Sequence, residues 1–143
     1  MTDVAPRTRS QTSTGTRSRR IVIVAFDGVQ ALDLVGPFEV FTGAADLVAS
    51  RAAEADPTNQ GHANRAYEVC AVSNAGVTVT TESGLTIGTD PLPNSSTPID
   101  TLVLTGGQGV QRARHDQGLI EWIRATAPRA RRVATVCTGT FLA

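Results

Sequence analysis

The chain contains no lysine, so all 13 of its basic side chains are arginines, and they balance 13 acidic side chains. This bias favours a GC-rich coding sequence over a surface built to bind phosphate. The two cysteines, Cys70 and Cys137, are too few for a disulfide framework. No stretch reaches the roughly 18 apolar residues of a membrane span, and the N-terminus lacks the apolar core of a secretory signal. These absences favour a soluble, cytoplasmic protein.

The first 20 residues have almost no apolar content and carry five arginines against a single acidic residue, Asp3. Such a composition predicts a disordered basic tail. A nucleic-acid-binding arm is the alternative, and the solvated tail is favoured over it. Hydrophobic residues make up 41% of the whole chain, which is enough for residues 21–143 to form one packed domain.

Apolar runs predict the main strands of a parallel sheet. They are residues 21–26, 67–72, 100–104 and 132–136. The first run is uninterrupted, which is typical of a central strand covered on both faces. Because these strands alternate with helical segments, we expect an α/β fold, a three-layer sandwich around a mostly parallel sheet.

Two amphipathic segments are predicted to be helices. Residues 31–41 carry apolar side chains at helical spacing, with Pro37 near the first turn. Asp116 is the expected N-cap of a second helix, which ends before Pro128. Both helices follow predicted strands, as an α/β fold requires.

The remaining segments are predicted to be loops and one hairpin. Residues 50–66 are polar and contain Pro57 and Gly61, which indicates a long surface loop. Residues 77–80 and 85–87 flank a Ser-Gly pair and predict the two strands of a small hairpin or arm.

Cys137 is the first candidate site residue. It ends an apolar strand, and the small residues Thr138 and Gly139 follow at once, as at a nucleophile elbow that leads into a helix. Helix N–H groups and the helix dipole would then favour the thiolate. The alternative is a core-filling cysteine, since free cysteine is commonly buried. Cys70 lies inside an alternating strand without such a turn, so we interpret it as a core cysteine.

Gly106 and Gly107 directly follow a buried strand. Such a turn can aim a backbone N–H at a developing oxyanion, and the N–H of Thr138 would supply a second donor. An ordinary tight turn is the alternative. The sequence around these glycines lacks both the phosphate-binding and the dinucleotide-binding spacing, so nucleotide binding is not expected.

Asp33 lies in the opening turns of the first helix, where an acid either favours the helix dipole or serves a site. Glu39 is interpreted as a helix-face charge. His62 and His115 have no partner at ligand or catalytic spacing, so both are expected to be exposed to solvent. Without a Cys/His cluster, we expect no metal and no cofactor.

Three blocks of sequence resemble the ThiJ/PfpI family of the class I glutamine amidotransferase-like superfamily. They are residues 26–41, 104–109 and 136–139. The first contains the pattern Asp-Leu-x-Gly-Pro-x-Glu-Val-Phe, which looks like both the N-terminal domain of AraC-type transcription regulators and isonitrile hydratases. The resemblance spans residues 21–143 and implies a flavodoxin-like topology.

This resemblance implies roles for the candidate residues. Cys137 takes the position of the elbow cysteine, and Asp33 that of the acidic residue near its sulfur. Gly107 and Thr138 take the oxyanion-hole positions. A protonated Asp33 could donate a hydrogen bond to the sulfur, whereas an ionised carboxylate would oppose thiolate formation.

The sequence also departs from that family. Three features of the family have no counterpart before Ala143. They are the histidine that many family enzymes place after the elbow, the last strands and helices of the domain, and the helix-turn-helix module of AraC-type regulators. We therefore expect a C-terminally truncated domain with an uncovered apolar sheet edge, prone to association. A homodimer is expected of the complete protein.

Two functions follow from the resemblance. The favoured one is the small-molecule-sensing domain of an AraC-type regulator, which reaches DNA only through a module absent from this chain. The alternative is a cysteine-dependent enzyme of the isonitrile hydratase or amidase kind, with Cys137 as nucleophile and Asp33 managing the proton. A remnant without function is a third possibility. No membrane partner is expected.

Overall fold

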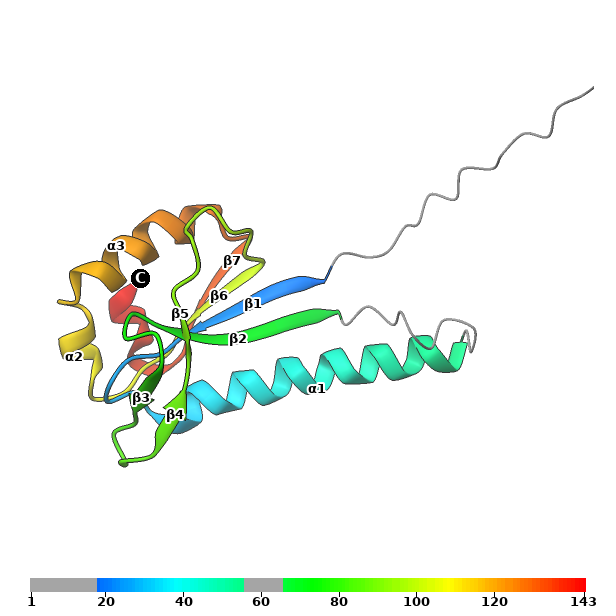
Figure 1. Cartoon of the computed structure of the whole chain (residues 1–143), viewed down its shortest axis with the longest axis horizontal. Coiled ribbons are helices and arrows are strands. Elements are labelled where there is room, and N and C mark those ends of the chain that lie inside the picture. Colours follow the sequence, from blue (N-terminus) through cyan, green and yellow to red (C-terminus); the bar gives the residue numbers. More distant parts are fainter. Residues whose placement is uncertain (1–17, 56–65) are drawn as a thin grey trace, which may run out of the picture.

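The computed structural model describes residues 18–55 and 66–143, and its centre is a five-stranded parallel sheet. The strand order is β5-β2-β1-β6-β7, as Figure 1 shows. The strands are β1 (Arg19–Val24), β2 (Tyr67–Ser73), β5 (Asp90–Pro91), β6 (Thr101–Leu104) and β7 (Arg132–Thr135). The predicted α/β fold with a mostly parallel sheet is confirmed. One predicted surface residue, His62, lies outside the described residues.

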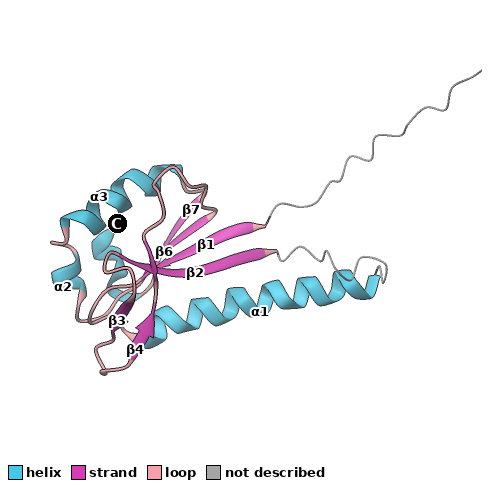
Figure 2. Cartoon of the chain, viewed as in Figure 1, coloured by secondary structure: helices cyan, strands magenta, loops and turns pink. Residues whose placement is uncertain are grey.

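The sheet lies between helices (Figure 2). The α-helices are α1 (Ala31–Ala55), α2 (Val110–Ala113) and α3 (Gln117–Thr126), and two 3₁₀ helices follow, η2 (Ala127–Arg129) and η3 (Cys137–Leu142). α1 and α3 lie on opposite sides of the strands (Figure 1). This follows from right-handed crossovers, because the chain moves from β1 toward one edge of the sheet and from β6 toward the other.

The core is built around β1, which has a parallel neighbour on each side. Ile21 through Ala25 are almost completely buried, in agreement with the uninterrupted apolar run. The Thr105 hydroxyl donates a hydrogen bond to the Val24 carbonyl at 2.5 Å and so satisfies a buried polar group where β6 ends. The strand begins at Arg19, two residues before the predicted start.

α1 is longer than the sequence indicated. Its apolar face packs on the core through Leu34, Phe38 and Phe41, and Ala45 is buried at the next position of the same helical spacing. The helix then continues to Ala55, so the prediction of a loop over residues 50–55 is wrong. The alanines and charged residues of this last part are good helix formers, and the nearby proline and glycine masked that preference.

Pro37 was predicted near the first turn of its helix, but α1 begins at Ala31 and Pro37 lies inside it. A proline there cannot donate the i to i−4 hydrogen bond that the Asp33 carbonyl would otherwise accept. Within the described residues, no helix combines the length and the apolar character needed to cross a lipid bilayer.

The predicted hairpin is present as a separate two-stranded antiparallel sheet. It consists of β3 (Thr78–Thr80) and β4 (Thr86–Gly88). Two short elements were not predicted, the helix α2 and the edge strand β5, whose Pro91 has no N–H to donate and so suits an edge. The Asp116 N-cap is confirmed, because its carboxylate accepts a hydrogen bond from the Leu119 N–H at 3.1 Å.

The register brings three loops to one edge of the sheet. Val24 pairs with Leu104, and Leu104 pairs with Thr135, so β1, β6 and β7 end at the same level. Ligands of open α/β sheets bind at this carboxyl edge. β7 lies at the end of the strand order among the described residues, and all four of its residues are exposed, including Val133.

Candidate functional site

Cys137 lies directly beyond β7, at a sharp change of backbone direction. Val136 is extended, with φ −115° and ψ 132°, and Cys137 then has φ 53°. Among the described residues, Cys137 is the one non-glycine residue with positive φ, a conformation that costs on the order of 1–3 kcal/mol. The side chain is exposed. This turn, the elbow, presents a thiol to solvent, and the helix that follows it is a 3₁₀ helix.

Two glycines let the elbow approach β6. A Cβ at Gly139 would collide with the Leu104 carbonyl oxygen, and a Cβ at Gly106 would lie 2.6 Å from the Thr138 backbone nitrogen. Real side chains do not tolerate such distances to backbone atoms, so both positions require glycine. The Gly106 turn and the elbow are packed backbone against backbone.

Thr138 joins the elbow to the glycine turn through its side chain. The Gly107 N–H donates a hydrogen bond to the Thr138 Oγ1 at 3.1 Å, and the hydroxyl lies 3.4 Å from the Gly107 carbonyl oxygen, to which it can donate. The N–H expected to serve an oxyanion is therefore already engaged. The Thr138 N–H lies in the first turn of η3, where helix N–H groups lack an intrahelical acceptor.

Asp33 lies behind the glycine turn. Its Oδ2 is buried without a hydrogen-bond partner in the described part of the chain, and it lies 3.0 Å from the position that a Gly106 Cβ would occupy. A buried acceptor without a donor is costly, which marks this carboxyl as a candidate for a functional role. Asp33 does not line the depression that contains Cys137.

That depression has a volume of about 320 Å³ and opens to solvent. Besides Cys137, its lining consists of Gln30, Glu82, Gly107, Gln108, Val110, Gln111 and Thr138. Of the predicted site residues, the structure thus brings Cys137, Gly107 and Thr138 together at one surface. Gly106 and Asp33 lie beneath that surface.

Glu82 is the site residue that sequence reasoning missed. Its Oε1 accepts a hydrogen bond from the Gln30 side-chain amide at 2.7 Å, and its Oε2 accepts one from the Gln108 backbone N–H at 2.9 Å. The Glu82 N–H donates to the Val29 carbonyl at 3.0 Å. These three bonds fix a carboxylate at the rim of the cysteine depression.

The hairpin β3–β4 carries Glu82 to the site because it docks on the loop after β1. Asp27 accepts a hydrogen bond from the Thr80 N–H at 2.8 Å, and the Gly28 N–H donates to the Thr80 carbonyl at 2.7 Å. Gln30 and Glu82 are 52 positions apart in the sequence, and no local pattern signals this contact. It depends on tertiary packing.

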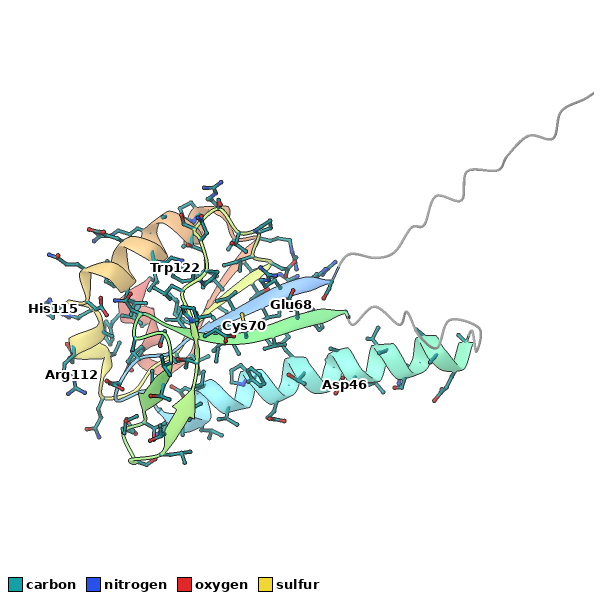
Figure 3. The ribbon with its side chains drawn as sticks, viewed as in Figure 1. Asp46, Glu68, Cys70, Arg112, His115 and Trp122 are labelled. Atoms are coloured by element: carbon teal, nitrogen blue, oxygen red, sulfur yellow. The ribbon has the colours of Figure 1, made fainter. Side chains whose placement is uncertain are left out.

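The other candidates lie apart from the depression. Cys70 is half-buried within β2, where Figure 3 labels it, and burial raises the pKa of its thiol to about 11. Glu39 and His115 are exposed, the latter beyond α2 (Figure 3). Over residues 18–55 and 66–143, no group of three or more His, Cys, Asp or Glu side chains is placed to hold a metal ion.

Comparisons with known proteins agree on a family. The DJ-1/PfpI family matches residues 19–143. An uncharacterised protein encoded upstream of cpoL in Streptomyces lividans is 32% identical over 123 residues, which are 86% of this chain and 76% of that protein. The isonitrile hydratase of Pseudomonas putida is 28% identical over 86% of this chain and 45% of its own length.

A further relative is the HTH-type transcriptional regulator Rv1931c of Mycobacterium tuberculosis, 56% identical over 46 residues. That match covers 32% of this chain and 18% of the regulator. Among solved structures, a ThiJ/PfpI family protein from Pseudomonas syringae has a TM-score of 0.67 at 19% identity, over 96% of this chain and 51% of that one. This likeness shows the fold, and the chain spans about half of that protein.

Proposed function

The chain belongs to the DJ-1/PfpI family, and we propose that it is the small-molecule-sensing domain of a transcriptional regulator of the AraC type. The depression around Cys137 is the proposed effector site. DNA binding is assigned to another part of the regulator, outside these 143 residues. The chain itself binds and reports a small molecule.

The observation that carries this proposal is that two backbone donors near the cysteine, those of Gly107 and Gln108, are engaged, whereas the Thr138 N–H lies in the first turn of η3. The Gly107 N–H is bonded to the Thr138 hydroxyl, and the Gln108 N–H is bonded to the Glu82 carboxylate. Oxyanion catalysis depends on preorganised donors that are free to meet the developing charge. Donors already satisfied by the chain's own acceptors favour binding over turnover. The similarity to a named HTH-type regulator supports the same conclusion.

The test uses the native gene. An epitope tag is placed before residue 19, and the tagged protein is analysed by chromatin immunoprecipitation and by its size on a denaturing gel. We expect enrichment of discrete promoter regions, carried by a protein large enough to include a DNA-binding module. A tagged protein that enriches no DNA region over an untagged strain would contradict the proposal.

A second candidate function is a cysteine-dependent isonitrile hydratase or amidase. It is favoured by the exposed thiol at a positive-φ turn and by the similarity to the Pseudomonas putida hydratase. Cys137 would attack the isonitrile carbon, which takes up a proton to give a thioimidate, and water would then release the formamide and the thiol. Asp33 is the residue proposed to handle the proton.

The two functions are separated by turnover of an alkyl isonitrile, followed as formamide release. The sensor predicts no release above that of Cys137→Ala. Sustained release by the unmodified chain that disappears in Cys137→Ala would establish the enzyme. Release that is unchanged in this variant would remove Cys137 as the nucleophile.

A further inference from the structure

The lining of the cysteine depression has a marked chemical bias. Its charged side chain is Glu82, and three glutamines, Gln30, Gln108 and Gln111, accompany it. No arginine, lysine or histidine lines it in the described part of the chain. An anionic ligand would therefore meet a carboxylate with no cation to offset the repulsion.

The Glu82 carboxylate is fixed yet has acceptor capacity left. Each of its oxygens accepts one hydrogen bond, Oε1 from Gln30 and Oε2 from Gln108. A carboxylate oxygen has two lone pairs, so each can take another donor. Because its position is already set by these bonds, a ligand that binds Glu82 pays little to order it.

Neighbouring charges do not reverse this bias. Arg112 lies in an adjacent depression that Glu82 also lines, together with the carboxylate of Asp27. Asp33 places a further carboxyl group behind Gly106. Arg112 is thus one cation beside three carboxyl groups, those of Glu82, Asp27 and Asp33. We therefore expect the electrostatic field at the thiol to favour a positively charged ligand.

We propose that this depression takes a small ligand that presents an N–H donor, as a cation or a neutral amide, to Glu82 and excludes carboxylates and phosphates. Glu82 is the specificity-determining residue. The inference rests on the proposed function in that this ligand is the effector of the regulator. Its chemistry follows from the lining alone.

Cys137 itself reports the charge preference. The chain is treated with three methanethiosulfonates: the trimethylammonium-ethyl cation, the neutral methyl reagent and the sulfonatoethyl anion. In each case the thiolate displaces methanesulfinate and forms a mixed disulfide. Rates are read by intact mass, assigned to Cys137 by peptide mapping, and divided by the rates of free 2-mercaptoethanol to remove intrinsic reactivity.

We expect the normalised rates to fall from cation to neutral reagent to anion. In Glu82→Gln, the cation-to-anion ratio should fall roughly three- to tenfold, because one negative charge is removed from the lining of the depression. Glutamine keeps one acceptor oxygen, which can serve one of the two donors, and thermal denaturation checks that the variant is folded. The matched control is Glu54→Gln, which removes a carboxylate near the far end of α1 and should leave the ratio unchanged.

A ratio near one in the unmodified chain, or a ratio that Glu82→Gln leaves unchanged, overturns the inference. A fall of equal size in Glu54→Gln does so as well, because the effect would then be one of net charge. None of these results bears on whether the regulator binds DNA. Failure of the ligand class and failure of the proposed function are therefore separate outcomes.

Discussion

The Gly107 N–H donates a hydrogen bond to the hydroxyl of Thr138 at 3.1 Å, and this bond joins the turn after β6 to the elbow after β7. Both residues occupy positions that the resemblance assigns to an oxyanion hole. Here one of them satisfies the other. This hydrogen bond therefore makes the Gly107 N–H unavailable to a ligand, and it connects the ends of the adjacent strands β6 and β7.

Removing the Thr138 hydroxyl tests that contact. Thr138→Val keeps the shape of the side chain but leaves the part-buried Gly107 N–H without its acceptor, so we expect a loss of about 1 kcal/mol in unfolding free energy. Thr138→Ser should retain most of the stability. The exposed Thr140 gives the control, Thr140→Val. Urea denaturation measures all three, and equal losses at the two positions would rule out a specific bond.

The glycine turn should tolerate no side chain. In Gly106→Ala, the new Cβ would meet the Thr138 backbone nitrogen at 2.6 Å, and two packed backbones would have to separate. We expect a loss of roughly 2–4 kcal/mol, if the variant folds at all. Gly43→Ala in α1 is the opposite case, because its Cβ meets nothing, and it should gain about 0.5–1 kcal/mol. Both are compared by urea denaturation, and a neutral Gly106→Ala would show that the loops are not interlocked.

The two cysteines should differ sharply in reactivity. Burial raises the pKa of Cys70 to about 11, so roughly one thousandth of it is thiolate at pH 8. Cys137 is exposed at the elbow. Brief treatment with iodoacetamide should therefore add one carbamidomethyl group, mapped to Cys137, whereas the unfolded chain in guanidinium should take two. Labelling of Cys70 at a comparable rate in the folded chain would contradict the burial argument.

Exposed apolar surface should make this chain associate. Leu32 and Val40 of α1 are 74% and 69% exposed, and Val133 lies on the exposed strand β7. We expect the mass from light scattering to rise with protein concentration. Val133→Lys should reduce this rise if the sheet edge mediates association, and Val40→Glu should reduce it if α1 does. A monomer at every concentration would contradict the association that we expect from both the sequence and the structure.

The main strands and the hairpin were accessible from sequence because continuous or alternating apolar runs mark them directly. The end of α1 was not, since the alanines and charged residues after Ser50 carry no face of large apolar side chains, and the nearby proline and glycine are typical of a loop. Local propensity for helix decided the outcome there. Periodicity alone cannot register that preference.

The candidate site divides in the same way. Cys137 and the glycine turn follow strand ends, so topology predicts that they meet. Glu82 reaches the depression only because a hairpin docks on the loop after β1 through Asp27 and Gly28. Likewise, the contact of Thr138 with Gly107 depends on how closely two loops pack. Neither contact could be predicted, because contacts that depend on tertiary packing leave no periodic or local pattern in the sequence.

Asp100 and Arg131 give a pH-dependent prediction. They lie just before β6 and β7, and the Arg131 guanidinium donates two hydrogen bonds to the Asp100 carboxylate, at 2.6 and 2.7 Å. These bonds lower the pKa of Asp100 from 3.8 to about 2. Since the folded-state pKa lies below the unfolded one, the pair stabilises the fold above about pH 4 and loses this effect as pH falls toward 2.

Asp100→Asn should therefore lower the thermal midpoint at pH 6, and the difference from the unmodified chain should shrink between pH 4 and pH 2. The pair is exposed enough to be screened, so the effect should be small and weaker at high salt. Glu121→Gln, which removes an exposed carboxylate of α3, is the control and should show no such convergence. A difference that persists at pH 2 would mean that Asp100 acts through packing, for instance through its hydrogen bond from Thr101, rather than through its charge.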